Sequence, residues 1–175
     1  DLPIVNFCKR KKINFFRGSE ENVLERYYET ANYFKLKNIV RLTSDCPLVD
    51  TKILDYMINF FEKNQLDFYS NSDPLPCKFP DGIFIEIFNY KTLKKTHLEA
   101  KLPSEREHVS FYMWKSGKFK TKRYDIEEDY SKYRFTLDYK EDLDFFRKIE
   151  RYFHENNLEF SLPKLFSFII VIVFF

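Results

Sequence analysis

The stretch that decides the fold is NIVRLTSDCPLVD, residues 38–50. Its first half, residues 38–43 (NIVRLT), is rich in aliphatic and β-branched residues and predicts a strand, whereas Pro47 predicts a loop over residues 44–50. On both sides the apolar residues recur every three or four positions, which is the spacing of an amphipathic helix. They are Leu24, Tyr27, Tyr28, Ala31 and Phe34 before the strand, and Leu54, Met57, Ile58 and Phe61 after it. A strand between two helices indicates an α/β fold.

The same alternation continues along the chain. We predict strands at residues 67–70, 83–88, 119–124 and 133–137, and helices at residues 90–100 and 105–114 and around residues 143–153. Three prolines and a closing Asp-Gly pair place residues 71–82 in a loop. Together these elements predict a mixed, mostly parallel sheet flanked by helices.

The chain end has a different composition. Residues 165–175 (LFSFIIVIVFF) carry no charge. A membrane-spanning helix needs about 20 apolar residues, so we expect no membrane span here. We expect instead a buried strand or an aberrant end, and we divide the chain into a domain over residues 1–160 and an apolar tail over residues 161–175.

Composition excludes several classes of protein. The 175 residues include 29 Lys and Arg and 27 Asp and Glu, and this near-neutral balance gives no reason to expect nucleic acid as a partner. The only glycines, Gly18, Gly82 and Gly117, are too far apart for a phosphate-binding or dinucleotide-binding glycine loop. The three cysteines form no CxxC pair, which argues against a zinc site and a disulfide scaffold.

Two carboxylates follow predicted strands. Ligands of open parallel sheets bind at the carboxyl ends of the strands, where Asp45 and Asp138 lie. Two such carboxylates could hold one Mg²⁺, which completes its coordination with water and substrate phosphates. Each residue also has a purely structural interpretation: Asp45 as a turn former before Pro47, and Asp138 as a helix start with Glu141.

Two further segments carry candidate residues. Asp81 and Gly82 form a tight turn, and Glu86 follows within an otherwise apolar strand, where a carboxylate must be solvated, paired or liganded. The alternative for Glu86 is an edge-strand charge that faces water. Arg106 and His108 lie in a predicted capped helix, where the histidine could carry a proton or donate to an anionic ligand, or could be an ordinary surface or core residue.

Five segments, in this order and spacing, resemble the cytidylyltransferases of the spore-coat polysaccharide biosynthesis type. These are relatives of the acylneuraminate and deoxy-octulosonate cytidylyltransferases. The segments are FFRGSEENVLERYYETA, IVRLTSDCPLVD, FPDGIFIEIF, EREHVSFYM and RFTLDYKEDLDFFRKI, and the resemblance covers about residues 2–154. It implies a nucleotide-diphospho-sugar transferase fold and the transfer of CMP from CTP to an acidic or surface-polysaccharide sugar, with release of pyrophosphate.

The resemblance also implies roles for individual residues. Asp45 and Asp138 look like the carboxylates that bind Mg²⁺. Residues 80–86 and the EREH segment would shape the sugar side of the pocket. We therefore expect Asp81, Gly82, Glu86, Arg106 and His108, together with Arg41 of the second motif, to bind substrate.

One family segment has no counterpart here. Such enzymes open with a strand and a loop of the kind ARxxSxRLPGK that holds the triphosphate, so we expect a fragment that lacks both and is inactive alone. The alternatives are a non-catalytic remnant or nucleotide-binding module, and a glycosyltransferase that uses a nucleotide-sugar donor on the same fold. The expected partners are CTP and a sugar, in the cytoplasm, with a possible homodimer.

Overall fold

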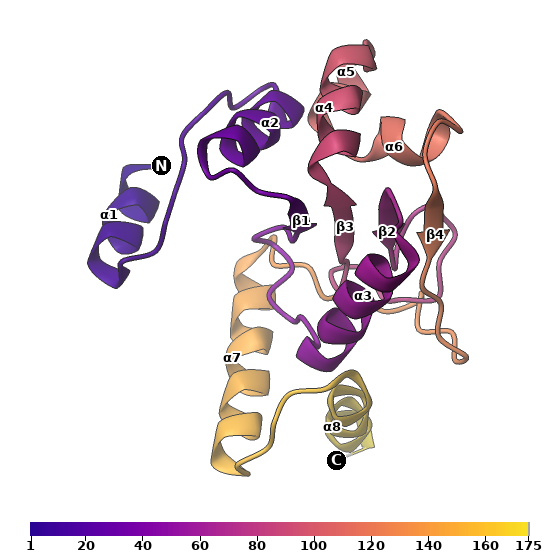
Figure 1. The fold of residues 1–175 in the computed structure, drawn as a ribbon. Coiled ribbons are helices and arrows are strands. Elements are labelled where there is room, and N and C mark those ends of the chain that lie inside the picture. Colours follow the sequence, from indigo (N-terminus) through magenta and orange to yellow (C-terminus); the bar gives the residue numbers. More distant parts are fainter. Residues whose placement is uncertain (175) are drawn as a thin grey trace.

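Each predicted amphipathic stripe forms a helix, and the apolar runs between the stripes supply the strands (Figure 1). The structure, a computed structural model, describes residues 1–174, and the side chains of residues 1–169. The helices are α1 (Leu2–Lys11), α2 (Val23–Tyr33), α3 (Thr51–Asn64), α4 (Tyr90–Glu99), α5 (Pro103–Glu107), α6 (Phe111–Lys115), α7 (Lys140–Glu155) and α8 (Leu162–Phe174). The strands are β1 (Asn38–Arg41), β2 (Phe68–Ser70), β3 (Glu86–Asn89) and β4 (Thr121–Arg123).

The four strands form one mixed sheet in the order β1-β3-β2-β4. This confirms the mixed α/β fold, but the sheet is less parallel than predicted: β3 is antiparallel to both β1 and β2, and only β2 and β4 pair in parallel. The reason lies in the connections. A helix, α3, links β1 to β2, which therefore run in the same direction, whereas the chain returns from β2 to β3 through a proline-containing loop without a helix and inserts β3 between them.

Helices cover both faces of the sheet because side chains alternate along each strand. On one face, Phe88 of β3 packs with Leu24 of α2 and Leu93 of α4. On the other face, Ile87 of β3 packs with Met57 of α3. The two faces give the sheet a core on each side, and they leave the strand ends open for a site.

The segment after α4 differs from its prediction. Residues 105–114 do not form one helix, because the chain breaks between α5 and α6 at Val109, which has a positive φ of 41° and is fully buried. The start of α5 is also capped differently from what the sequence favours, which is a capping box of Ser104 and Glu107. The carboxylate of Glu105 accepts from the backbone N–H of Leu102 at 3.1 Å instead.

Two predicted strands, residues 83–88 and 133–137, differ most from the structure. Residues 83–88 become a strand only from Glu86 onward. Residues 133–137 form an isolated parallel bridge between Arg134 and Asp81 rather than a strand. This bridge nevertheless ties the loop before β3 to the segment before α7, and both segments carry candidate site residues.

The apolar chain end forms a helix, α8, so the prediction of a strand there was wrong; Phe175 lies outside the described residues. Leu165 and Phe166 of α8 are buried in the same apolar cluster as Phe153 of α7. In Figure 1 α7 runs from the level of the lower strand ends to the bottom of the view, where α8 lies. Among the described residues, no helix is both long and apolar enough to cross a membrane. The division at residue 160 stays a prediction.

Candidate functional site

A cavity of about 410 Å³ lies beside the ends of β1, β2 and β3. It brings together four predicted substrate-binding residues from separate parts of the chain, namely Arg41, Asp81, Glu86 and His108. Its remaining lining residues are Thr43, Ser72, Asp73, Leu75, Phe84, Ser110 and Phe111. Eight of these eleven lining residues carry polar or charged side chains, and three of the eight are acidic.

Glu86 lines this cavity and is almost fully buried. The register of β1 and β3 places Arg41 directly opposite Glu86, and the Arg41 Nη1 atom lies 2.7 Å from Glu86 Oε2. The Ser110 hydroxyl donates to the other carboxylate oxygen at 2.7 Å. Glu86 is only 4% exposed and β3 lies inside the sheet, so the alternative of an edge-strand charge facing water was wrong.

Arg41 stays charged in this setting. Burial alone would lower the pKa of its guanidinium, but the nearby Glu86 carboxylate more than offsets that effect and the pKa is raised overall. The guanidinium also lies over the ring of Tyr27, 5.9 Å from its centroid. Arg41 is thus held between an anion and an aromatic face.

Asp73 is a site residue that the sequence analysis missed. Burial, and then the hydrogen bond and charge of Glu86, raise the pKa of Asp73 to about 7. A usable signal existed, because Asp73 follows β2 by three residues and so lies near a strand's carboxyl end, as Asp45 does. The prolines of this segment predict only a loop.

Asp45 and Asp138 lie on adjoining backbone segments. The backbone N–H of Leu137 donates to the carbonyl oxygen of Asp45 at 2.8 Å, which links the loop after β1 to the residue before Asp138. The carboxylate of Asp138 accepts from the Thr136 hydroxyl at 2.7 Å and from Arg134 Nη1 at 2.9 Å. Neither Asp45 nor Asp138 lines the 410 Å³ cavity itself.

The structural interpretation of Asp138, that it starts a helix together with Glu141, was wrong. Asp142, rather than Asp138 with Glu141, satisfies the start of α7, because its carboxylate accepts from the backbone N–H groups of Asp138 and Tyr139, both at 2.9 Å. Asp138 is therefore not used as a helix cap.

The loop of Asp81 and Gly82 is held against the segment before α7. The backbone N–H of Phe135 donates to the Asp81 carbonyl at 2.7 Å, and the Asp81 N–H donates to Tyr133 at 3.0 Å. Gly82 has a φ of +88°, and a Cβ at this position would overlap the backbone of Phe135. Glycine is required here both by the backbone conformation and by the close approach.

The donor set near Asp45 and Asp138 fits Mg²⁺ better than a softer metal. Carboxylate oxygens are the ligands that Mg²⁺ prefers, and it usually takes only one or two of them. Within the described part of the chain, no group of three or more His, Cys, Asp or Glu residues is placed to hold a metal ion. Asp138 would share its carboxylate between a metal and its bonds to Arg134 and Thr136.

The structure separates the two residues predicted near the start of α5. His108 is exposed, lines the cavity and packs its ring against Phe111, with the centroids 4.6 Å apart. Arg106 points elsewhere, because its guanidinium donates to the carbonyl oxygen of His97 at 2.8 Å, and it is absent from the cavity lining. This hydrogen bond links α5 to the end of α4.

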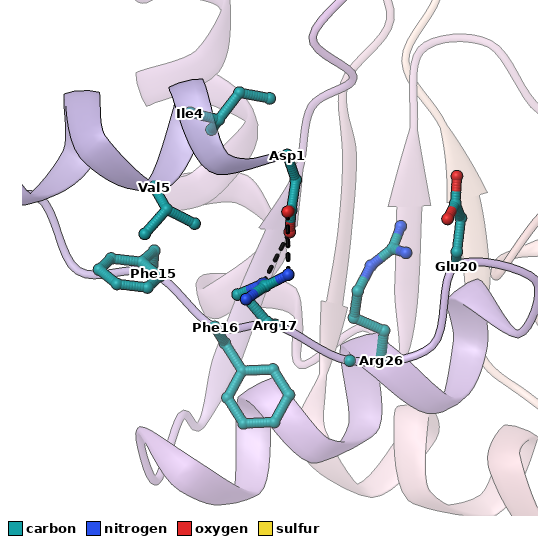
Figure 2. Close-up of a pocket in the computed structure, with 9 residues that line it drawn as sticks. Asp1, Ile4, Val5, Phe15, Phe16, Arg17, Glu20 and Arg26 are labelled. Carbon is teal, nitrogen blue, oxygen red and sulfur yellow. Dashed lines mark hydrogen bonds and ion pairs between the residues drawn. The ribbon is translucent and has the colours of Figure 1, made fainter.

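A second hollow lies beside α1, and Figure 2 shows its lining. Its volume is about 740 Å³, larger than that of the first cavity. Asp1 and Arg17 face each other across it and form a two-bond ion pair at 2.7 and 2.9 Å. None of the candidate residues reaches this hollow, so we place the site at the strand ends.

A mixed sheet covered by helices, with carboxylates and a polar cavity at its strand ends, defines an α/β protein built to bind a ligand at that edge. The chain belongs to the cytidylyltransferase family, whose sequence model matches residues 3–161. This confirms the family that the motif order indicated.

Three known proteins are similar to this chain. The solved structure of a cytidylyltransferase from Leptospira borgpetersenii serovar Hardjo-bovis superposes with a TM-score of 0.86 at 37% identity, over 97% of this chain and 71% of that one. The spore coat polysaccharide biosynthesis protein SpsF of Bacillus subtilis is 33% identical over 77% of this chain and 56% of its own length. The uncharacterized protein MJ1063 of Methanocaldococcus jannaschii is 29% identical over 91% of this chain and 65% of its own length. The chain thus spans a little over half to about two thirds of the curated relatives it matches.

Proposed function

We propose that this chain supplies the acceptor side of an enzyme that transfers CMP from CTP to a sugar and releases pyrophosphate. Membership of the cytidylyltransferase family supports nucleotidyl transfer. The cavity at the strand ends supports a polar, hydroxyl-bearing acceptor, since most of its lining residues carry carboxyl, hydroxyl or other polar groups. The proposed setting is the cytoplasm, and a homodimer is part of the proposal.

The observation that carries this proposal is the hydrogen bond between the Leu137 N–H and the Asp45 carbonyl, at 2.8 Å. It joins the two segments that bear Asp45 and Asp138, which lie 93 positions apart in the sequence. We assign these two carboxylates to Mg²⁺. The metal, when bound, would neutralise charge on the phosphate oxygens of the nucleotide.

In the proposed reaction a sugar hydroxyl attacks the α-phosphorus of CTP. A new oxygen–phosphorus bond forms, the bond to the pyrophosphate oxygen breaks, and the hydroxyl proton passes to solvent or to a nearby carboxylate. Such transfers depend mainly on positioning and on electrostatic stabilisation, and no covalent nucleophile is required. The chain's own contribution is to hold the sugar in the cavity formed by Asp81, Glu86 and their neighbours.

The test is CTP-dependent pyrophosphate release, measured on this chain joined to the opening strand and phosphate loop that the family resemblance implies. We expect Asp45→Asn and Asp138→Asn to lower kcat by about 100-fold or more, because each removes half of the protein's charge toward the metal. Asp55→Asn, at an exposed position on α3, is the matched control and should leave the rate unchanged. Wild-type rates in both site variants would remove Asp45 and Asp138 from the mechanism.

The same assay separates the alternatives. Calorimetric binding of CTP and Mg²⁺ without any transfer would favour a nucleotide-binding module. Sugar transfer from a UDP-sugar, with no reaction of CTP, would favour a glycosyltransferase. Absence of both binding and transfer would favour a non-catalytic remnant.

A further inference from the structure

The charge of the cavity lining restricts the sugar that it can bind. Among the described lining residues, Asp73, Asp81 and Glu86 carry carboxyl groups, whereas Arg41 carries the one guanidinium. An incoming carboxylate would need a cation or several free hydrogen-bond donors to replace the water that it loses. The number of acidic groups alone therefore makes this cavity a poor match for an anion.

One nitrogen of the guanidinium is already bound by the protein. Arg41 Nη1 lies 2.7 Å from Glu86 Oε2, and the side chains of Arg41 and Glu86 are only 19% and 6% exposed. Ser110 uses its hydroxyl proton on the second oxygen of the same carboxylate at 2.7 Å. The Ser110 hydroxyl and one guanidinium nitrogen are thus bound to Glu86, while Arg41 Nε is buried without a partner among the described residues. Drawing the guanidinium away to a substrate carboxylate would leave buried Glu86 without its cation.

Other charged groups near the cavity do not outweigh the carboxyl groups of its lining. Lys115 is close enough to Asp73 to influence its charge, but its ammonium group lies over the rings of Phe111 and Trp114, 4.2 and 5.0 Å from their centroids. His108 is exposed and packs against Phe111. Burial, and then the hydrogen bond and charge of Glu86, raise the pKa of Asp73 to about 7.

We propose that the acceptor sugar of this site carries no carboxylate and is a polyhydroxylated or amino sugar, bound through its hydroxyl and amino groups to the carboxyl and hydroxyl side chains of the lining. Carboxylates accept well from hydroxyl and ammonium groups. This inference rests on the proposed transferase function. It departs from the acidic sugar that the resemblance to acylneuraminate cytidylyltransferases would suggest.

The test compares acceptors that differ only in charge, in the same elongated chain with CTP and Mg²⁺. One pair is N-acetylneuraminate and its carboxamide, and a second set is glucuronate, glucose and glucosamine. We expect kcat/KM to be about tenfold or more higher for the uncarboxylated members, a difference typical of one charge-assisted hydrogen bond. Preference for the carboxylated members would overturn this inference and leave the transferase function standing. No transfer to any acceptor would overturn both.

Two variants test whether the lining causes the preference. Glu86→Gln removes the charge that holds Arg41, and Asp73→Asn removes a carboxyl group without touching Arg41. Each should shift the ratio of kcat/KM values toward the carboxylated acceptor by about tenfold. Glu150→Gln, at an exposed position on α7, is the matched control. Thermal melts identify any variant that fails to fold, and an unchanged ratio in a folded variant would contradict the proposal.

Discussion

Replacing Gly82 with alanine tests the contact that holds the candidate site together. Gly82 has a φ of +88°, and an added Cβ would overlap the carbonyl group of Phe135 and lie 2.7 Å from the backbone nitrogen of Thr136. Both neighbours are backbone groups, which cannot swing aside as a flexible side chain can. The segment of Asp81 must therefore move away from the segment before α7.

The cost of Gly82→Ala follows from what is lost. An alanine in the left-handed region costs roughly 1–2 kcal/mol. The displaced loop also loses the hydrogen bonds from Asp81 N–H to Tyr133 at 3.0 Å and from Phe135 N–H to Asp81 at 2.7 Å. At about 1 kcal/mol for each bond, the free energy of unfolding should fall by about 3–4 kcal/mol.

The assay is urea unfolding at pH 7, followed by the fluorescence of Trp114. Gly117→Ala is the matched control, because Gly117 also has a positive φ, of +67°, but a Cβ there meets no described atom within 4 Å. The control should lose only about 1–2 kcal/mol, from backbone strain alone. Equal losses in the two variants would refute the reasoning, since they would show that the approach to Phe135 adds nothing.

Two further predictions concern acidic side chains. The free energy of unfolding should fall as the pH rises between 3.8, the ordinary pKa of an aspartate, and about 7, because folded Asp73 binds its proton more tightly than the unfolded chain does. Asp73→Asn should remove that part of the pH dependence in urea titrations, and an unchanged slope would contradict the assignment. Asp50→Ala should cost about 2–3 kcal/mol, since buried Asp50 caps α3 through Lys52 N–H at 2.9 Å and also accepts from Leu162 N–H at 2.8 Å. Asp50→Asn keeps an acceptor oxygen and should lose less; a loss below about 1 kcal/mol in the alanine variant would show that α8 does not depend on this contact.

Local patterns predicted most of the helices and the central strands. The stripes around Leu24 and Met57 form α2 and α3, and the alternation around Glu86 places Phe88 and Ile87 on opposite faces of the sheet. The failures came where tertiary contacts outweigh local preference. Val109 interrupts a predicted helix because its side chain is buried in the core, and the apolar chain end becomes the helix α8 rather than a strand.

The candidate site shows the same limit. Local sequence drew attention to Glu86 because a carboxylate among apolar residues needs a partner, but it could not identify that partner. Arg41 lies 45 positions away, and only the antiparallel register of β1 and β3 brings the two together at 2.7 Å. The raised pKa of Asp73 has the same kind of origin, because it comes from burial and from Glu86 rather than from neighbours in the chain.

The order of motifs along the chain was sufficient to determine the family, since residue types and spacings are properties of the sequence alone. The periodicity of apolar residues likewise determined that the segments around Leu24 and Met57 become helices, because each can bury one apolar face. Only the tertiary structure decided which carboxylates meet a cation, which lie against one another, and that Arg106 turns away from the cavity while His108 lines it. These outcomes depend on distances between residues far apart in the chain, and strand pairing and helix packing, not local sequence, set those distances.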